Sequence, residues 1–557
     1  MNSTPFTWPG LISEMDMSSV EHAGLRASSY IICSRPLGSR HSVICHGYTG
    51  AVDIVPERIA QIFQPHTPEA MWSVRVLHKD PPKGAWKEQT SAHATWESLT
   101  GTEIAHLQSR GYLTKLTEEA ERQYVALLVE RIHAYHTRHL AVLIAPYMDC
   151  NLRCAYCFQR DLQKQIGRDT NAAIASVMTR EQVDAVFEVL REQRDAGTQV
   201  RRDITLYGGE ALQSTTRKIV EYIITKGKTL GFQFKAISNG FELDRFFDLL
   251  GPHGIEHVQI TIDGPEESHN AKRPGRHGER TYTEILTNLL SALHEIDVRF
   301  EIGINVDVKN IANLPGLLEI FRIKGLIGHP RVGIHANEVY SVKDRKSAFE
   351  DNFNSVETIR EKAAEYGVML SNATGNLHRV LLRHISDGQP LPLNPVYCSA
   401  VTGMFIFAPD GALYSCWEAV GETTGHVGRY YPNFEINKDS FDRWTNRVAS
   451  RVDECHRCEY IMFCGGGCTM NSYRRNGKFL TPYCDSFEGK YTDLLTCIWK
   501  QWIDARQSPE APIALNSAFP MYEPGEISEE IIQRLTGVAD LTKTMTRDGE
   551  NWLCNFH

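Results

Sequence analysis

The stretch LAVLIAPYMDCNLRCAYCF, residues 140–158, holds a short apolar run followed by three closely spaced cysteines. The run from Leu140 to Ala145 predicts a buried β-strand, because it is short, apolar and followed by a proline. Cys150, Cys154 and Cys157 come next, with three and then two residues between them. Three thiolates in one such loop can bind three irons of a cubane cluster and leave the fourth iron open to a small molecule. The alternatives are a zinc site that lacks its fourth ligand and a dithiol redox pair at Cys154 and Cys157.

Downstream of this stretch, short apolar runs alternate with amphipathic helices, which is typical of βα units around a parallel sheet. One such helix is predicted after Thr179, which can form a capping box with Gln182. Barrels of this kind carry their active-site loops at the C-terminal ends of the strands. The sequence therefore predicts an α/β fold, a partial (β/α)6 TIM-like barrel with the six strands Leu140–Ala145, Asp203–Tyr207, Phe232–Ile237, His257–Ile262, Phe300–Asn305 and Arg331–His335.

The regions on either side of the barrel have other patterns. Residues 28–55 contain two β-rich runs, and a helix is predicted from Thr117. The proline-containing stretch Gln64–Lys87 between them is predicted to be a connector. After about residue 385 the alternation stops, and seven cysteines with glycine-rich turns run to Cys484, so we expect metal to stand in for an apolar core. We expect four units: an N-terminal α+β region (1–138), the barrel (139–385), a cysteine-rich domain (386–500) and a C-terminal extension (501–557).

The composition narrows the class of protein. With 557 residues, 42% of them hydrophobic and 23% charged, the chain is long enough for several folding units and is neither fibrous nor wholly disordered. No stretch approaches the roughly 18 apolar residues of a membrane span, and no export signal is recognisable, so a cytoplasmic location without membrane contact is expected. The net charge of −9, without a stripe of Lys and Arg, argues against a nucleic-acid partner.

The 14 cysteines are the most informative feature of the composition. Dense, clustered thiols in a reducing compartment indicate metal or redox chemistry rather than disulfides. Seven further cysteines form a second group, and a pair of zinc ribbons, which also use C-x-x-C motifs, is an alternative interpretation of them. A c-type haem site is excluded, because Cys458 is followed by Glu459 and not by histidine. The members of this second group are Cys398, Cys416, Cys455, Cys458, Cys464, Cys468 and Cys484.

The first cysteine group, with Tyr156 at the aromatic position of a CxxxCx-aromatic-C pattern, resembles the signature of the radical SAM superfamily. That resemblance implies a [4Fe-4S] cluster whose open iron chelates the amino and carboxylate groups of S-adenosylmethionine. Reduction of the bound cofactor then gives a 5′-deoxyadenosyl radical that abstracts hydrogen. A reducing electron donor such as flavodoxin or ferredoxin is implied as a partner.

Short motifs after the later strands are similar to the cofactor-binding motifs of the same family. By this resemblance Gly208, Gly209 and Glu210 receive the methionine amino group, where the glycines permit close approach and the carboxylate pairs with an ammonium. Ser238 contacts the ribose or the carboxylate, although Ser238–Gly240 could also be only a turn, and Arg273 grips the carboxylate. The remaining cofactor-binding candidates are Asp263 and Asn305, of which Asn305 could merely end its strand.

The order of the second cysteine group resembles the SPASM domain, which carries auxiliary clusters in radical SAM enzymes that modify peptides. The resemblance implies that Cys455, Cys458, Cys464 and Cys484 ligate one [4Fe-4S] cluster in full. A second such cluster, nearer the active site, is held by Cys398, Cys416 and Cys468, and is one ligand short. Its fourth position could be open, or be filled by water or a stray cysteine. Three [4Fe-4S] clusters are therefore expected in total.

Together these resemblances imply an oxidoreductase that abstracts hydrogen from a ribosomally synthesised precursor peptide, with crosslinking or another oxidative modification as the product. The N-terminal β-region could bind a leader peptide on an edge strand, or could be purely structural. The alternatives are radical modification of a non-peptide metabolite, and a non-catalytic iron–sulfur scaffold or redox sensor. A sulfatase-type maturase is a further alternative. Such enzymes place an aspartate directly after the second SPASM cysteine, whereas here Trp417 and then Glu418 follow Cys416, so Glu418 is the candidate base.

Overall fold

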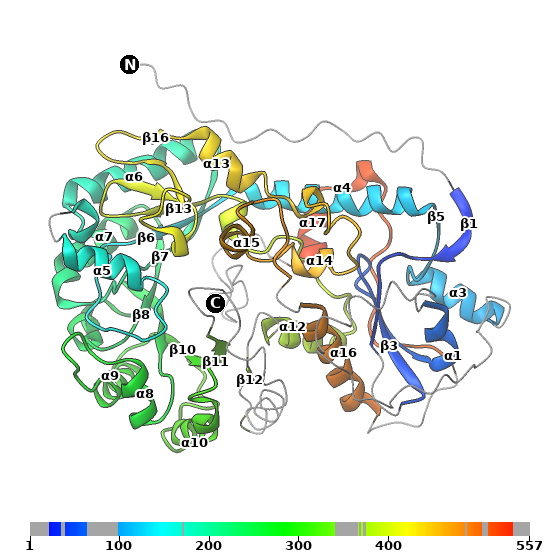
Figure 1. The fold of residues 1–557 in the computed structure, drawn as a ribbon, viewed down its shortest axis with the longest axis horizontal. Coiled ribbons are helices and arrows are strands. Elements are labelled where there is room, and N and C mark those ends of the chain that lie inside the picture. Colours follow the sequence, from blue (N-terminus) through cyan, green and yellow to red (C-terminus); the bar gives the residue numbers. More distant parts are fainter. Residues whose placement is uncertain are drawn as a thin grey trace.

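The computed structural model describes residues 22–34, 39–63, 99–169, 172–339, 366, 369–370, 375–484, 487–503 and 511–537. A barrel lies on the left of Figure 1 and an N-terminal region lies on the right. The strands of the cysteine-rich region lie beside the barrel at the upper left, and its helices α14 (Ile461–Cys464) and α15 (Thr469–Asn476) lie in the middle. The long helix α4 (Glu118–Thr137) runs along the top from the N-terminal region to the barrel. The predicted connector Gln64–Lys87 lies outside the described residues.

The barrel contains the six predicted parallel strands, which confirms the α/β fold class. Each strand is a short apolar run, and residues such as Ile144, Ile260 and Ile302 are fully buried in one continuous core. The strand bounds are β6 (His139–Ile144), β7 (Gln199–Leu206), β8 (Gln233–Ser238), β9 (Ile255–Thr261), β10 (Arg299–Val306) and β11 (Val332–Glu338).

Helices surround the outer face of this sheet (Figure 1). Helix α6 (Arg180–Asp195) begins with the predicted capping box between Thr179 and Gln182, and its apolar face is buried. The other outer helices are α5 (Arg160–Arg168), α7 (Arg217–Thr229), α8 (Glu266–Lys272), α9 (Tyr282–Glu295) and α10 (Leu314–Ile323).

The cysteine-rich region extends the barrel sheet. Strand β13 (Met404–Phe407) runs parallel to β6, and β14 (Ala412–Tyr414), β15 (His426–Arg429) and β16 (Glu435–Ile436) continue the sheet as antiparallel strands. Phe405 and Phe407 are fully buried in the same core as the barrel. The expectation that metal stands in for an apolar core is therefore wrong for this part of the region, because the run from Met404 to Phe407 is as apolar as a barrel strand. Two-residue β12 (Met369–Leu370) forms the opposite edge of the sheet.

The N-terminal region contains a second sheet in the order β17, β4, β3, β2. The predicted β-rich runs supply β2 (Ile31–Ser34), β3 (His41–His46) and β4 (Val52–Pro56), because the second run turns back on itself. The C-terminal extension supplies β17 (Ile513–Ala514), which pairs with β4, and α17 (Glu529–Thr536), which packs on α4. The remaining elements include β1 (His22–Ala27), β5 (Leu113–Leu116), α1 (Glu57–Ala60), α3 (Gly101–Ser109), α12 (Gly375–Ser386), α13 (Lys438–Thr445), α14 (Ile461–Cys464), α15 (Thr469–Asn476) and α16 (Phe487–Ile503).

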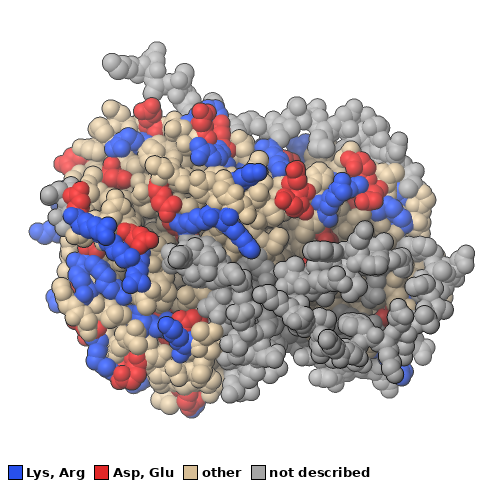
Figure 2. All heavy atoms as spheres, viewed as in Figure 1, with Lys and Arg blue, Asp and Glu red and all other residues tan. Residues whose placement is uncertain are grey.

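The surface has no single dominant charge on the face that Figure 2 shows, where basic and acidic side chains are interspersed over the described part. None of the helices within the described ranges is both long enough and apolar enough to span a membrane.

Candidate active site

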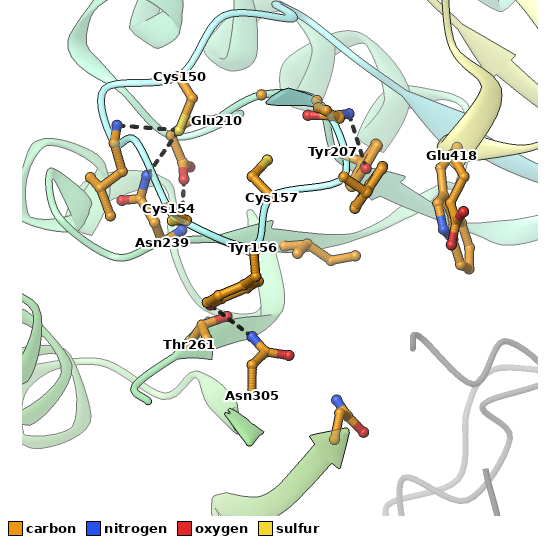
Figure 3. Close-up of a pocket in the computed structure, with 18 of the residues that line it drawn as sticks. Cys150, Cys154, Tyr156, Cys157, Tyr207, Glu210, Asn239, Thr261, Asn305 and Glu418 are labelled. Carbon is orange, nitrogen blue, oxygen red and sulfur yellow. Dashed lines mark hydrogen bonds between the residues drawn. The ribbon is translucent and has the colours of Figure 1, made fainter. Parts of the chain in front are cut away.

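A cavity of about 240 Å³ opens at the C-terminal ends of the barrel strands. The loop that follows β6 contributes Cys150, Cys154 and Cys157 to one side, and the cysteine-rich region contributes Glu418 to another. Figure 3 shows Tyr207 between Cys157 and Glu418. The cavity therefore lies between the two cysteine groups and is lined by residues of both regions.

The cysteine loop is held by charged side chains that lie outside the cavity. Asp149 accepts a hydrogen bond from the backbone N–H of Cys150 at 2.8 Å, and it forms ion pairs with Arg153 and Arg276. Arg276 also donates to the carbonyl of Cys150 at 2.9 Å. These contacts fix the direction of the loop at the end of β6.

The same loop is paired by its backbone with the segment that carries Arg273. The N–H of Arg153 donates to Pro274 O and the N–H of Ala155 donates to Lys272 O, both at 2.9 Å. Arg273 is 6% exposed and lines the cavity. Its Nη1 donates to the hydroxyl of Tyr156, whereas its Nε is buried and makes no hydrogen bond with the described residues.

The hydroxyl of Tyr156 is the centre of a buried polar network. It donates to Asp263 and accepts from Nδ2 of Asn305 at 3.0 Å. Asp263 also accepts from the backbone N–H of Asn305 at 2.7 Å. Asn305 and Tyr156 line the cavity, but Asp263 is not among the lining residues and is placed behind Tyr156. The structure therefore places Asp263 where it can orient Tyr156 and Asn305 rather than face the cavity.

Lys272 is a member of this network that the sequence interpretation did not include. Its Nζ donates to Asn305 O at 2.9 Å and to Asp307 at 3.1 Å, and it lies 5.2 Å from the centre of the Tyr156 ring. It belongs to no recognisable sequence motif, so the sequence did not identify it as a site residue. Its role in the structure is to hold the end of β10 against the cysteine loop.

The glycines after β7 allow that strand end to approach the cysteine loop closely. A Cβ on Gly209 would lie 2.4 Å from the carbonyl oxygens of both Met148 and Asp149, and a Cβ on Gly208 would lie 2.2 Å from Tyr147 O. Gly208 has φ +148°, which L side chains rarely adopt. No larger residue fits at either position without moving the loop.

Glu210 is brought to the cavity by these glycines. Its carboxylate accepts hydrogen bonds from the backbone N–H groups of Leu212 at 2.7 Å and Asn239 at 2.6 Å. Burial raises the pKa of Glu210 to about 7, against the lowering effect of these hydrogen bonds. A buried carboxylate with a raised pKa gains most from a cationic partner, which would restore the charged form.

Ser238 and Asn239 lie at the end of β8 and also line the cavity. Ser238 Oγ accepts from the N–H of Gly240 at 3.0 Å, so it stabilises the turn as well as facing the cavity. Asn239 Nδ2 lies 3.7 Å from Cys150 Sγ and donates to Asn151 at 2.7 Å. Asn239 is a further candidate residue, and its position inside the Ser238–Gly240 motif is the signal that could have identified it.

The second cysteine group falls into two sets in space. Cys398 and Cys468 are close enough to Cys416 for their charge to raise its pKa, after the larger effect of burial. In the same way, Cys484 and Cys455 raise the pKa of Cys464, which burial and these neighbours bring to about 12. The pKa of Cys458 is raised mainly by burial, and the charges of Cys464 and Cys455 raise it further. These sets are the ones that the SPASM resemblance implies, and their ligation of iron stays a prediction.

Neighbours of the second cysteine group reach the cavity in place of the cysteines themselves. Residues within three positions of four of the cysteines line it: Tyr397, Trp417, Glu418, Asn471 and Tyr483. Trp417 packs its ring against Tyr207, with the ring centres 6.5 Å apart. The sequence interpretation missed Tyr207, although it directly precedes the Gly208–Glu210 motif.

Glu418 is fixed by a neighbouring arginine. Arg474 donates to the Glu418 carboxylate at 2.8 Å, to its carbonyl oxygen at 2.9 Å, and to Glu422 at 2.8 Å. The side chain of Glu418 is 15% exposed. The structure therefore brings the candidate base to the cavity in an ion pair.

The side chains at the first cysteine group fit a cluster that binds an amino acid. The three thiols line the cavity together with Glu210 and Arg273, and Nε of Arg273 is buried without a hydrogen-bond partner among the described residues. Within the described ranges, no three His, Cys, Asp or Glu side chains converge closely enough to hold a single metal ion.

Residues 144–306 match the family model described as the Radical SAM superfamily, which confirms the class predicted for the barrel. Among solved structures, that of anSMEcpe with bound AdoMet is similar, with 17% identity and a TM-score of 0.48 over 66% of this chain and 98% of the other. The structure of Streptococcus suis SuiB bound to precursor peptide SuiA is similar over 82% of this chain and 98% of the other, with 13% identity and a TM-score of 0.40. No curated protein sequence matches the chain.

Proposed function

We propose that this radical SAM enzyme abstracts a hydrogen atom from a ribosomally made peptide and completes an oxidative modification, such as a crosslink, between its two cysteine groups. The observation that carries the proposal is the single cavity lined by the thiols of the first group and by the neighbours of the second. A substrate in that cavity would be within reach of both groups. The purely scaffolding alternative gives no reason for such a cavity.

The cofactors are assigned to this chain's residues as follows. Cys150, Cys154 and Cys157 would hold a [4Fe-4S] cluster, and with S-adenosylmethionine it supplies a carbon-centred radical that removes a hydrogen atom. Glu210 would bind the amino group of the cofactor. That group is an ammonium, and a cation beside the buried Glu210 carboxylate would offset the effect of burial on its pKa. Arg273 would bind the cofactor carboxylate through its unbonded Nε, while Tyr156 holds Nη1 in place.

The second cysteine group would hold two auxiliary [4Fe-4S] clusters, which supply electron transfer to or from the cavity. Trp417, Tyr207 and Glu418 line the cavity, and we propose that their side chains bind and orient the substrate. We propose Glu418 as the group that accepts a substrate proton. Flavodoxin or ferredoxin is proposed as the reducing partner.

The peptide class of the substrate rests on the resemblance of the second group to SPASM domains. We propose that the N-terminal sheet binds a leader segment of the precursor by strand addition. The two edges of that sheet are β17, which has two residues, and β2, which has four, and we assign the leader to the longer edge β2.

The first experiment is anaerobic reconstitution of the wild type and of the variant Cys150→Ala/Cys154→Ala/Cys157→Ala. Three four-iron clusters predict about 12 irons per wild-type chain and about eight in the variant. Only the wild type is expected to release 5′-deoxyadenosine under strong reductant. Addition of the correct precursor peptide should increase the amount released, and the mass of that peptide should change. A wild type that binds zinc or makes no 5′-deoxyadenosine would overturn the proposal and favour the scaffold. Turnover on a metabolite without any peptide would favour the second enzymatic alternative.

A further inference from the structure

Arg447 is a buried cation in the cysteine-rich region, between α13 and Cys455. It is 1% exposed and is one of the largest fully buried side chains. Its guanidinium donates to four backbone carbonyls: Gly466 at 2.8 Å, Phe479 at 3.0 Å, Thr481 at 3.1 Å and Gly465 at 3.5 Å. No aspartate or glutamate in the described part of the chain forms an ion pair with it. Carbonyl dipoles satisfy its N–H groups but supply no net negative charge.

Cysteines of both sets lie near this guanidinium. Cys455 and Cys464 of one set and Cys398 and Cys468 of the other are near enough to act on its charge. A Cβ built on Gly466 would lie 3.2 Å from Arg447 Nη1 and 3.5 Å from Cys455 Sγ, so a single glycine separates the two side chains. Arg447 therefore lies between the two sets.

A run of three glycines makes this approach possible. Gly465, Gly466 and Gly467 join Cys464 to Cys468 and have φ values of +62°, +78° and +74°. A Cβ on Gly467 would lie 1.8 Å from Tyr483 O. The loop from Cys464 to Cys468 therefore bends around Arg447, and the carbonyls of Gly465 and Gly466 accept hydrogen bonds from the guanidinium.

A guanidinium stays protonated in proteins, and a buried charge without an opposite charge is strongly disfavoured. Thiols that keep their protons carry no charge, so they do not balance the charge of Arg447. A cysteine that binds iron is deprotonated outright. The charge of Arg447 is thus matched only when the thiolates carry a metal cluster.

We propose that Arg447 is the counter-charge shared by the two auxiliary clusters and that it raises the reduction potential of both. The inference rests on the proposed function, because it assumes that the two cysteine sets hold iron. The net charge around an iron–sulfur cluster is one of the factors that set its potential, and a nearby cation favours the reduced, more negative form. Arg447 is a positioning residue here and touches no substrate.

The test compares Arg447→Gln, which removes the charge, with Arg447→Lys, which keeps it. Both are made in the Cys150→Ala/Cys154→Ala/Cys157→Ala protein, so that only auxiliary clusters contribute to the signal. The readouts are iron per chain and midpoint potentials from a reductive titration followed by electron paramagnetic resonance. Arg447→Gln is expected to shift both auxiliary midpoints to lower potential, whereas Arg447→Lys leaves them close to the parent values.

Arg451→Gln is the matched control. Arg451 lies four positions along the chain, but it is paired with Glu130 at 2.9 Å and its side chain is 31% exposed. Its charge is already balanced and partly solvated, so its loss should leave both midpoints unchanged.

The outcomes separate this inference from the proposed function. A parent protein without auxiliary iron contradicts both. A parent with about eight irons whose midpoints are the same in Arg447→Gln, or fall equally in both variants, contradicts the role of Arg447 alone. If Arg447→Gln does not fold, Arg447→Lys decides: parent-like midpoints and iron support the counter-charge, and lowered midpoints or lost iron contradict it.

Discussion

The two cysteine regions balance their buried cations in different ways. In the first, Arg273 lies beside Asp263, at 3.8 Å, and donates to Tyr156, so the site carries its own opposite charge. In the second, Arg447 donates only to backbone carbonyls among the described residues. The first site is preorganised by the protein and faces an open cavity, which suits a ligand that comes and goes. By our proposal, the charge in the second would be balanced only by the iron–sulfur clusters that its cysteines hold.

The largest expected effect separates the two regions by function. Cys154→Ala should abolish 5′-deoxyadenosine formation, because it removes a thiol from the first group. Cys468→Ala should retain cofactor cleavage but lose peptide product, since it alters only the second group. Chromatography of 5′-deoxyadenosine and the mass of the peptide measure the two outcomes. Loss of cleavage in Cys468→Ala would show that the regions do not act separately.

The next prediction concerns the close packing of the first region. Gly209→Ala would place a Cβ 2.4 Å from two loop carbonyls, so the cysteine loop must move. Overpacking of this kind costs about 1–3 kcal/mol, and we expect S-adenosylmethionine binding to weaken by about tenfold or more. Equilibrium binding to the reconstituted enzyme measures the effect.

Gly167→Ala on α5 is the control for this substitution, because a Cβ there meets nothing within 4 Å. It should bind the cofactor as the wild type does. Equal binding by the two variants would mean that the loop tolerates the added methyl group.

Acid should destabilise the support of the second region. Nε2 of His133 donates a hydrogen bond to Thr445 O at 2.8 Å. Burial lowers the pKa of His133 to about 4 and that of His136, also on α4, to about 3. Unfolded histidines titrate near 6.5, so the unfolded chain binds more protons below that pH and the folded state loses stability as pH falls. Between pH 6.5 and 5 the loss is about 2 kcal/mol for each histidine.

Chemical denaturation at several pH values measures this dependence. His136→Leu should flatten it, because Nε2 of His136 makes no hydrogen bond with the described residues that the variant would lose. His277→Gln, at an exposed position, should leave the pH dependence unchanged. An unchanged slope in His136→Leu would contradict the assignment.

The smallest effect tests the network of the first region. Tyr156→Phe removes the hydroxyl that joins Asp263, Asn305 and Arg273, and we expect it to reduce the free energy of unfolding by about 1–2 kcal/mol. Iron content should persist while cofactor affinity falls. Tyr222→Phe removes a hydroxyl bonded to partly exposed Asp184 and should change stability less. Equal effects of the two substitutions would mean that the network adds nothing beyond one hydrogen bond.

The first region could be predicted almost entirely from the sequence, because its strand, loop and cysteines are contiguous. One exception is Asp263, whose direction at a strand end depends on Tyr156 across the barrel. Lys272, Asn239 and Tyr207 were also missed, because their contacts are made only when separate strand ends come together. The extension of the sheet by β13 was missed because strands of three or four residues between cysteines leave no periodicity to detect. Arg447 was missed because a lone arginine forms no motif, and its meaning comes only from residues brought together by folding.

The pairing of β13 with β6 has a consequence for how this protein could be divided or recombined. Met404–Phe407 lies in register with Ala141–Ile144, on the strand that leads into the first cysteine loop. A fragment that ended near residue 385 would leave that side of β6 as an open, wholly apolar strand edge, which is a template for aggregation. The cysteine-rich region is thus not a detachable module, and a chimera that grafts it onto another barrel must carry β13 and a matching β6 together.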